Sequence, residues 1–324
     1  MSPRAVKVER GLGKGGKEVA KVERGLGKGG KEVAKVEPGL TQSGEEAVEL
    51  PLSAEVMAQA GSENFPVASR LLPRRQRRHL LAIYGFARLV DEIGDESSGD
   101  REAALRWIAE DLDRAYLGQA RHPLLVTLAS TVRACGLPRE PFERLIEANR
   151  RDQRVARYAT WSELLGYCEL SANPVGELVL GVFGLADAER VGLSDAVCTA
   201  LQVVEHLQDV AEDLACGRIY LPGEDRERFG VSEAALAAPH ASAAVRALIA
   251  HEAHRAALLL DTGQALVNTL RGRPRLAVAA FVAGGRAALG AIAAAGYDVL
   301  AGPPRASRGA LLAALPRTLR EARR

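Results

Sequence analysis

Two segments far apart in the chain each carry a pair of aspartates four residues apart. Asp91 and Asp95 lie in YGFARLVDEIGDE, and Asp209 and Asp213 lie in LQVVEHLQDVAEDLACGRIYLP. Residues i and i+4 of an α-helix share a face, so each segment would project two carboxylates side by side. Like charges at this spacing disfavour a helix by roughly 0.2–0.5 kcal/mol per pair. The two pairs therefore predict two acidic helix faces that confront each other and require cations.

Further carboxylates stand beside both pairs, namely Glu92, Glu96, Glu205 and Glu212. Hard carboxylate oxygens suit Mg²⁺, which commonly takes one or two carboxylates, keeps some of its water and leaves positions for phosphate oxygens. The hypothesis is a cavity between the two acidic helices that holds a diphosphate through Mg²⁺. A single D-x-x-x-D pair would be weak support, because solvated acidic faces often contain one.

The rest of the sequence predicts an all-α fold with an aliphatic core. The chain has 324 residues, of which 47% are hydrophobic and only 4% aromatic, and it contains no convincing alternating strand pattern. Apolar residues instead recur close to a 3.6-residue period. Helices are expected after Pro73 to about residue 90, after His122 and Pro123, and over 100–117, 142–158, 160–182, 194–214, 245–270 and 277–300. Asn64 and Pro66 predict a further helix start, and Pro174 predicts a kink.

The N-terminal region predicts a tail outside the folded domain. The unit KVERGLGKGGKEVA occurs at 7–20 and again at 21–34, and it is rich in Gly and Lys. Such a segment buries too little apolar surface to offset its ordering entropy, so residues 1–45 are expected to be disordered. A lysine-rich arm on anionic lipid is the functional alternative. The catalytic domain is expected over 50–302, followed by an Arg/Ala-rich tail over 303–324 that is partly loose.

Charge and cysteine usage exclude several classes of protein. Residues 1–40 hold ten Lys and Arg against five Glu, so the remainder of this +2 chain is net −3, which argues against nucleic-acid binding. The four cysteines form no zinc pattern and predict reduced thiols in the cytoplasm. No apolar signal segment is visible at the N-terminus. The apolar run 276–285 is shorter than the roughly 20 residues that span a bilayer, which leaves peripheral contact with the inner face of a membrane open.

Four motifs together resemble a known family. They are FPVASRLLP, YGFARLVDEIGDE, RYATWSELLGYCELSANPVGELVL and QDVAEDLACGRIYLP. Over about residues 55–300 the chain resembles the squalene/phytoene synthases, trans-isoprenyl diphosphate synthases that join prenyl diphosphates head to head. The segments DEIGDE, RRDQRVARYATW and VEHLQDVAEDLACGR are most similar to the HpnC branch, the hydroxysqualene synthases of bacterial hopanoid pathways. The resemblance implies a single-domain isoprenoid synthase bundle of antiparallel helices around a central cavity.

The resemblance also implies roles for individual residues. The aspartates at 91, 95, 209 and 213 match two motifs that bind Mg²⁺ and, through it, diphosphate. The remaining matches are Arg88 at the diphosphate, Phe65 beside the substrate chains, Tyr84 and Gln202 in the cavity, and Arg218 and Tyr220, which reach the diphosphate or close the site. Read from the sequence alone, Arg88 also fits a surface ion pair and Tyr84 a core position. Arg286 lies in a stretch that the family places near the cavity.

One position departs from the family pattern. Dehydrosqualene and phytoene synthases have Asn where this chain has Glu205, and His206 follows it. Glu205 is either an extra metal ligand or a group that places a water molecule. Presqualene diphosphate ionises to a carbocation, which hydride converts to squalene, proton loss to dehydrosqualene or phytoene-like products, and water to hydroxysqualene. We hypothesise that Glu205 and His206 favour water, although His206 also fits a purely structural helix histidine.

The sequence thus predicts Mg²⁺-dependent conversion of presqualene diphosphate and water to hydroxysqualene and diphosphate, with other enzymes of the pathway upstream and downstream. The alternative within the family is a squalene, dehydrosqualene or phytoene synthase that condenses two prenyl diphosphates such as farnesyl diphosphate. The alternative from another class is a non-catalytic helical assembly factor, which the four intact aspartates disfavour. Product branch, prenyl chain length, NADPH use and oligomeric state stay open.

Overall fold

The structure is a computed structural model that describes residues 22–26, 32–36, 49–51, 53–58, 72–96 and 99–321. This part of the chain is almost entirely helical, which confirms the predicted all-α class. The longer helices are α2 (Arg74–Glu96), α3 (Arg101–Tyr116), α4 (Pro123–Cys135), α5 (Glu140–Asp152), α6 (Trp161–Ser171), α7 (Asn173–Val182), α8 (Ala188–Gln208), α12 (Ala243–Thr269), α13 (Gly272–Ala294) and α14 (Arg308–Glu321). The shorter ones are α1 (Ser53–Ala58), α9 (Val210–Ala215), α10 (Gly223–Arg228) and α11 (Glu233–Leu236).

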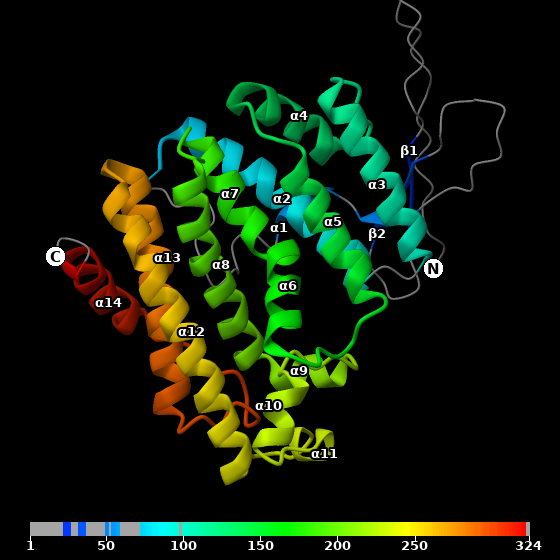
Figure 1. Cartoon of the computed structure of the whole chain (residues 1–324). Coiled ribbons are helices and arrows are strands. Elements are labelled where there is room, and N and C mark those ends of the chain that lie inside the picture. Colours follow the sequence, from blue (N-terminus) through cyan, green and yellow to red (C-terminus); the bar gives the residue numbers. More distant parts are fainter. Residues whose placement is uncertain are drawn as a thin grey trace, which may run out of the picture.

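The helices form a bundle around a cavity that is lined mainly by α2, α7, α8 and α13, with single residues from α6 and α12. In one half of the bundle α2 packs on α3, α4 and α5, and in the other half α8 and α13 pack on α12 (Figure 1). Clusters of buried and mainly aliphatic side chains fill both halves, as the composition predicts. Each helix therefore buries one apolar stripe and leaves the inner cavity to side chains from the four helices that line most of it.

Local capping signals place most helix starts where the sequence predicts them. The Asp100 side chain accepts a hydrogen bond from the backbone N–H of Ala103 at 2.9 Å, and the Thr160 hydroxyl accepts one from the backbone N–H of Glu163 at 3.2 Å. These contacts satisfy backbone donors that have no partner inside the helix. The predicted kink is a complete break, because Ala172 ends α6 and Pro174 stands in the first turn of α7.

Several predicted helix bounds are wrong. The helix predicted over 194–214 begins earlier, at Ala188. The helix predicted over 142–158 ends at Asp152, so that Tyr158 lies in a loop. The helix predicted over 277–300 is α13, which starts and ends earlier. The tail after residue 303, predicted to be partly loose, contains α14, and the buried amide of Gln264 on α12 donates a hydrogen bond to the carbonyl of Thr318 at 2.9 Å. Tertiary packing therefore orders a segment whose composition alone indicates a loose tail.

Three short strands correct the expectation that the chain has none. β1 (Val22–Leu26), β2 (Glu32–Val36) and β3 (Glu49–Pro51) pair antiparallel in that order. β1 belongs to the second copy of the 14-residue repeat, and β2 begins near the end of that copy and runs into the next KVE segment. The other residues of the predicted 1–45 tail lie outside the described residues, as do the predicted helix start at Asn64 and the aromatic Phe65.

Helix α13 is long and apolar enough, by length and composition, to cross a membrane. The apolar run 276–285, which is too short to span a bilayer, is only part of this helix, which has 23 residues. Half of its most apolar window is buried inside the bundle, against α8, α12 and α14. This burial is what a core helix of a bundle shows, and α13 forms one wall of the cavity.

The close approach of α8 and α12 depends on Gly263. A Cβ at this position would lie 2.4 Å from Cγ2 and 3.0 Å from the backbone nitrogen of Val197. We expect Gly263→Ala to lower the free energy of unfolding by about 1–3 kcal/mol, the usual cost of overpacking a core. Gly192→Ala on the exposed side of α8 is the matched control, because a Cβ there meets nothing within 4 Å. Denaturant unfolding should show that the control gains up to about 1 kcal/mol; equal effects of both variants would contradict the packing argument.

Candidate active site

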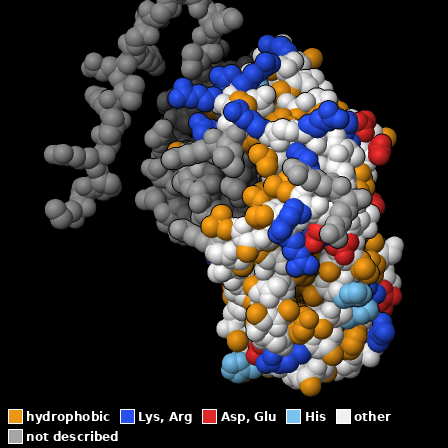
Figure 2. Space-filling view, turned by 90° about the vertical axis from the view of Figure 1, so that its left-hand side faces the viewer, with side chains coloured by type: hydrophobic (Ala, Val, Ile, Leu, Met, Phe, Trp, Pro, Cys, Tyr) orange, Lys and Arg blue, Asp and Glu red, His pale blue; other side chains and the backbone are white. Residues whose placement is uncertain are grey.

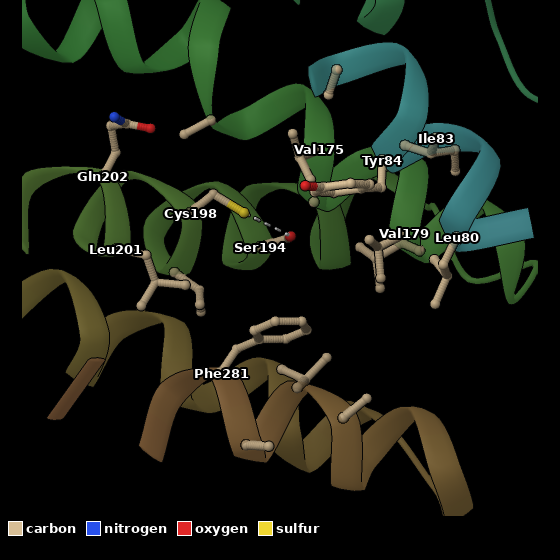
Figure 3. Close-up of a pocket in the computed structure, with 18 of the residues that line it drawn as sticks. Leu80, Ile83, Tyr84, Val175, Val179, Ser194, Cys198, Leu201, Gln202 and Phe281 are labelled. Carbon is tan, nitrogen blue, oxygen red and sulfur yellow. Dashed lines mark hydrogen bonds between the residues drawn. The ribbon is translucent and has the colours of Figure 1, made fainter. Parts of the chain in front are cut away.

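The central cavity has a volume of about 510 Å³ and walls that are mostly Leu, Val, Ala and Phe side chains. Leu80, Ile83 and Tyr84 enter it from α2, Val175 and Val179 from α7, and Leu201 and Gln202 from α8, while Phe281 points into it from α13 (Figure 3). Polar groups gather toward one end, where Arg88, Asp91, Gln202 and Glu205 contribute to the lining. An apolar chamber with a polar end fits a ligand that has a long apolar chain and a charged head.

The first acidic pair is positioned by contacts between α2 and α5. The Asn149 amide donates a hydrogen bond to Oδ1 of Asp91 at 3.0 Å. Gly94 permits this approach, because a Cβ there would lie 2.1 Å from Oδ1 of Asn149. Gln153 on the same side of α5 donates a hydrogen bond to the Gly94 carbonyl at 3.0 Å. The glycine between the two aspartates therefore lets α5 support the acidic face of α2.

Asp91 has a perturbed pKa. Its side chain is open to solvent, but protein atoms surround it at the end of the cavity, and this desolvation raises the pKa of the carboxyl to about 6. The hydrogen bond from Asn149 and the charge of Arg88 act in the opposite direction, whereas the carboxylates of Asp95 and Asp152 raise the pKa further. A carboxylate held under such repulsion gains from a cation beside it.

The second acidic pair lies where the helix is interrupted. The sequence predicts one helix over 194–214, but α8 ends at Gln208 and α9 begins at Val210, with Asp209 between them at φ −103° and ψ 16°. The backbone N–H of Asp213 still donates to the carbonyl of Asp209 at 2.8 Å, so the two residues keep helical spacing. Burial raises the pKa of Asp209, and the charges of Glu212 and Asp213 add to this rise.

An ion pair joins the two acidic segments. Arg218, which follows α9, approaches Asp95 of α2 with 2.6 Å between Nη2 and Oδ1. Burial lowers the pKa of the Arg218 guanidinium, but the hydrogen bond and the charge of Asp95 outweigh burial and raise the pKa overall. The chain beyond the second aspartate pair therefore returns to the first pair.

A cluster of aromatic rings supports this polar end. The His206 ring stacks on the Tyr220 ring at 3.8 Å between centroids and 10° between planes. Tyr167 donates a hydrogen bond to Oδ2 of Asp152 at 2.7 Å, and Tyr220 donates a longer one to Oδ1 at 3.4 Å. Burial and the Asp152 charge raise the pKa of Tyr220, so its phenol stays protonated at neutral pH and acts as a hydrogen-bond donor.

The structure brings most of the predicted site residues to this end of the bundle. Tyr84, Arg88, Asp91, Gln202 and Glu205 line the cavity itself. The other described candidates, Asp95, Asp209, Asp213, Arg218 and Tyr220, are not among the lining side chains. The charge of Asp95 acts on Asp91, as does that of Asp152. Arg218 contacts Asp95, and Tyr220 contacts Asp152. The roles that the sequence analysis assigns to all these residues stay predictions, and Phe65 lies outside the described residues.

Arg286, which the sequence analysis placed in a stretch near the cavity, makes its contacts elsewhere. Its guanidinium pairs with Asp261 of α12 at 2.8 Å and with Glu321 of α14 at 2.7 Å. It is not a lining residue of the cavity. The arginine therefore fastens α14 to α12 and α13, a role that requires a partner helix which the sequence did not predict.

Three residues at the site were missed by sequence reasoning. Asn149 and Asp152 lie in EANRRDQ, and Arg305 lies close enough to Asp209 for its charge to lower that residue's pKa. The motif RRDQRVARYATW already marked the neighbourhood of Asp152, but nothing in the local pattern showed that α5 ends beside α2. Arg305 follows Pro304, whose carbonyl accepts a hydrogen bond from Gln208 at the end of α8.

The residues at this end fit a hard divalent cation. The donors are carboxylate oxygens, and Asp91 and Asp209 have pKa values raised by burial and by neighbouring carboxylates. The four aspartates do not converge on one point. Among the described residues, the group of three that places its ligand atoms within 4.8 Å of one another is Asp225, His251 and Glu252, remote from this site. The separation between the two aspartate pairs leaves room for a ligand's own oxygens between them.

Comparisons with known proteins agree with this architecture. A model of the squalene/phytoene synthase family matches residues 58–310. The hydroxysqualene synthase of Zymomonas mobilis subsp. mobilis is 38% identical over 191 residues, which are 58% of this chain and 64% of that relative. The presqualene diphosphate synthase of Rhodopseudomonas palustris is 35% identical over 185 residues, which are 56% of this chain and 66% of that relative. The match thus spans just under two thirds of the length of each of these two relatives.

A solved structure extends the similarity over most of the chain. The crystal structure of squalene synthase HpnC from Alicyclobacillus acidocaldarius superimposes with a TM-score of 0.70 and 47% sequence identity. The match covers 78% of this chain and 94% of that one. The chain therefore belongs to the squalene/phytoene synthase family.

The raised pKa of Asp91 predicts how cation binding depends on pH. The free carboxyl is protonated below about pH 6 and ionised above it, so affinity for Mg²⁺ with inorganic diphosphate should fall as the pH drops through this value. Asn149→Ala removes a hydrogen bond that favours the ionised form, so the loss of affinity should begin at a higher pH. Gln153→Ala is the control, because the Gln153 side chain hydrogen-bonds to the backbone carbonyls of Gly94 and Asn149 and to the Arg101 guanidinium and makes no hydrogen bond to an aspartate carboxylate. The measurement is calorimetric titration of the unaltered protein and of both variants at several pH values. A pH profile of Asn149→Ala that coincides with the other two would contradict the role of Asp91 in cation binding.

Proposed function

We propose that this protein converts presqualene diphosphate and water to hydroxysqualene and diphosphate with the help of Mg²⁺. The observation that carries the proposal is an apolar cavity with a polar end that is lined by Arg88, Asp91 and Glu205. The apolar walls suit two long isoprenoid chains, and the acidic end suits a metal-bound diphosphate. The similarity to a hydroxysqualene synthase supports the choice of product.

The aspartates at 91, 95, 209 and 213 would hold Mg²⁺ through carboxylate oxygens. When bound, Mg²⁺ neutralises charge on the departing diphosphate and so favours rupture of the carbon–oxygen bond. Arg88 lies on the cavity wall one turn before Asp91 and is placed to bind diphosphate oxygens directly. Arg218, already near Asp95, supplies a second guanidinium beside the same acidic end.

Glu205 is proposed to govern the fate of the carbocation. The carbon–oxygen bond breaks with its electron pair on the leaving diphosphate, a water oxygen donates a pair to the carbocation, and the released proton passes to the Glu205 carboxylate. Glu205 lines the cavity one turn after Leu201 and beside His206, whose Nε2 lies 3.2 Å from the Gln202 amide nitrogen. An acceptor of this kind at the boundary between apolar and polar walls favours capture of water over loss of a proton from carbon.

The related enzymes leave one rival within the family. The similar proteins bear the names hydroxysqualene synthase, presqualene diphosphate synthase and squalene synthase. A protein with this cavity could therefore act one step earlier and condense two farnesyl diphosphates. Glu205, where the resemblance implies Asn in the dehydrosqualene and phytoene branches, favours the water-dependent step.

A product assay tests the reaction. Purified protein is incubated with Mg²⁺ and either presqualene or farnesyl diphosphate, without NADPH, and the extract is identified by mass spectrometry. Hydroxysqualene from presqualene diphosphate, abolished by EDTA, is the expected result. A hydrocarbon product, or presqualene diphosphate formed from farnesyl diphosphate alone, would assign the protein to another branch of the family and contradict the proposed reaction. No turnover of either substrate would favour the non-catalytic alternative.

Substitution of Glu205 tests the residue that would direct water. Glu205→Asn and Glu205→Gln keep the side chain polar but remove the proton acceptor, so hydroxysqualene should fall at least tenfold relative to elimination products if general-base help is worth about 10²–10⁴ in rate. Asp261→Asn is the control, because this exposed carboxylate of α12 pairs with Arg286 away from the cavity. An unchanged ratio of products in both Glu205 variants would refute the assignment.

A further inference from the structure

The end of the cavity opposite the aspartates reaches the molecular surface. Leu72 and Leu80 at the start of α2 line this end together with Arg273 and Leu276 at the start of α13. Arg273 is exposed, and Leu276 retains 42% of its accessible surface. The starts of α2 and α13 lie at the same end of the bundle in Figure 1. The described walls of the cavity therefore extend from the acidic site to an apolar opening at the surface.

The chain is basic on both sides of this opening. Four arginines stand at the start of α2, and the sequence contains no Asp or Glu from residue 72 to residue 90. Three more stand around the start of α13, within a stretch from residue 262 to residue 297 that also lacks acidic residues. These arginines, named here the basic collar, are Arg74, Arg75, Arg77, Arg78, Arg271, Arg273 and Arg275. In the upper part of the face seen in Figure 2, hydrophobic side chains lie among Lys and Arg side chains.

We propose that the basic collar docks the protein on an anionic lipid bilayer, with the apolar opening of the cavity facing the acyl chains. Each Lys or Arg near such a surface contributes about 1 kcal/mol of attraction. Leu276 is exposed next to Arg273 and close in sequence to Arg271 and Arg275, and an exposed leucine with arginines beside it resembles the shallow interfacial anchors of peripheral proteins. This inference rests on the proposed function only for the identity of the molecule that passes through the opening. That molecule is an apolar product, which would otherwise have to enter water.

Charge argues for lipid over a second copy of the chain. A twofold dimer through this face would bring one basic collar against another, with no carboxylate in either stretch to neutralise them. The acidic groups of the cavity stand at its other end, so the molecule is polarised along the cavity. An anionic membrane complements the basic end and leaves the diphosphate end open to the aqueous side.

Vesicle sedimentation tests the basic collar. The full chain is spun with vesicles of pure phosphatidylcholine and with vesicles that contain phosphatidylglycerol, at low and high salt. Binding should require phosphatidylglycerol and weaken with salt. Arg74→Glu, Arg78→Glu and Arg271→Glu combined should reduce the partition coefficient at least tenfold. Arg106→Glu, Arg154→Glu and Arg228→Glu combined are the matched control, because these arginines are also exposed but lie on α3, after α5 and on α10.

Fluorescence quenching tests the orientation. Leu276→Trp places a reporter at the opening, and Leu258→Trp places one at an exposed position on α12 that retains 54% of its surface. Lipids brominated on the acyl chain should quench the first reporter and leave the second unchanged. Equal partition into neutral vesicles, an equal loss in both triple variants, or quenching of the Leu258→Trp reporter alone would overturn the proposal. None of these readouts requires turnover, so they are independent of the product assay.

Discussion

Repulsion among carboxylates at one end of an apolar cavity is the constraint on which this structure depends. Asp91 and Asp209 both have pKa values raised by burial and by neighbouring acids. The protein offsets part of this repulsion with its own groups, the Asn149 amide on Asp91 and the Arg218 guanidinium on Asp95. The repulsion that these groups leave uncompensated favours the binding of a divalent cation together with a diphosphate.

The rest of the bundle positions that end. Gly94 allows α5 to approach α2, the break at Asp209 turns the chain toward Arg218, and the stacked rings of His206 and Tyr220 fill the space behind them. The apolar walls come mainly from four helices, so no single segment encodes the cavity. In the mechanism and the membrane docking that we propose, the acidic end binds the diphosphate and the basic end releases the apolar product.

Much of the helical fold could be predicted from local sequence patterns. Capping residues such as Asp100 and Thr160 fix helix starts because their side chains bond the first backbone N–H groups. Asn149, Asp152 and Arg305 could not be found in that way, since their importance lies in contacts across long sequence separations. The ordered C-terminal helix was missed for the same reason, because α14 is held by Gln264 and Arg286 on other helices.

The sequence by itself determined the helical class, the two acidic pairs and the motifs that place the chain in its family, because all three depend on residue type and spacing along one segment. Only the tertiary structure decided which residues line the cavity, that Arg286 pairs with Asp261 and Glu321 away from it, and that the starts of α2 and α13 lie at the same end of the bundle. These features arise when segments distant in sequence pack together, and the pairing of helix faces is set by the whole core.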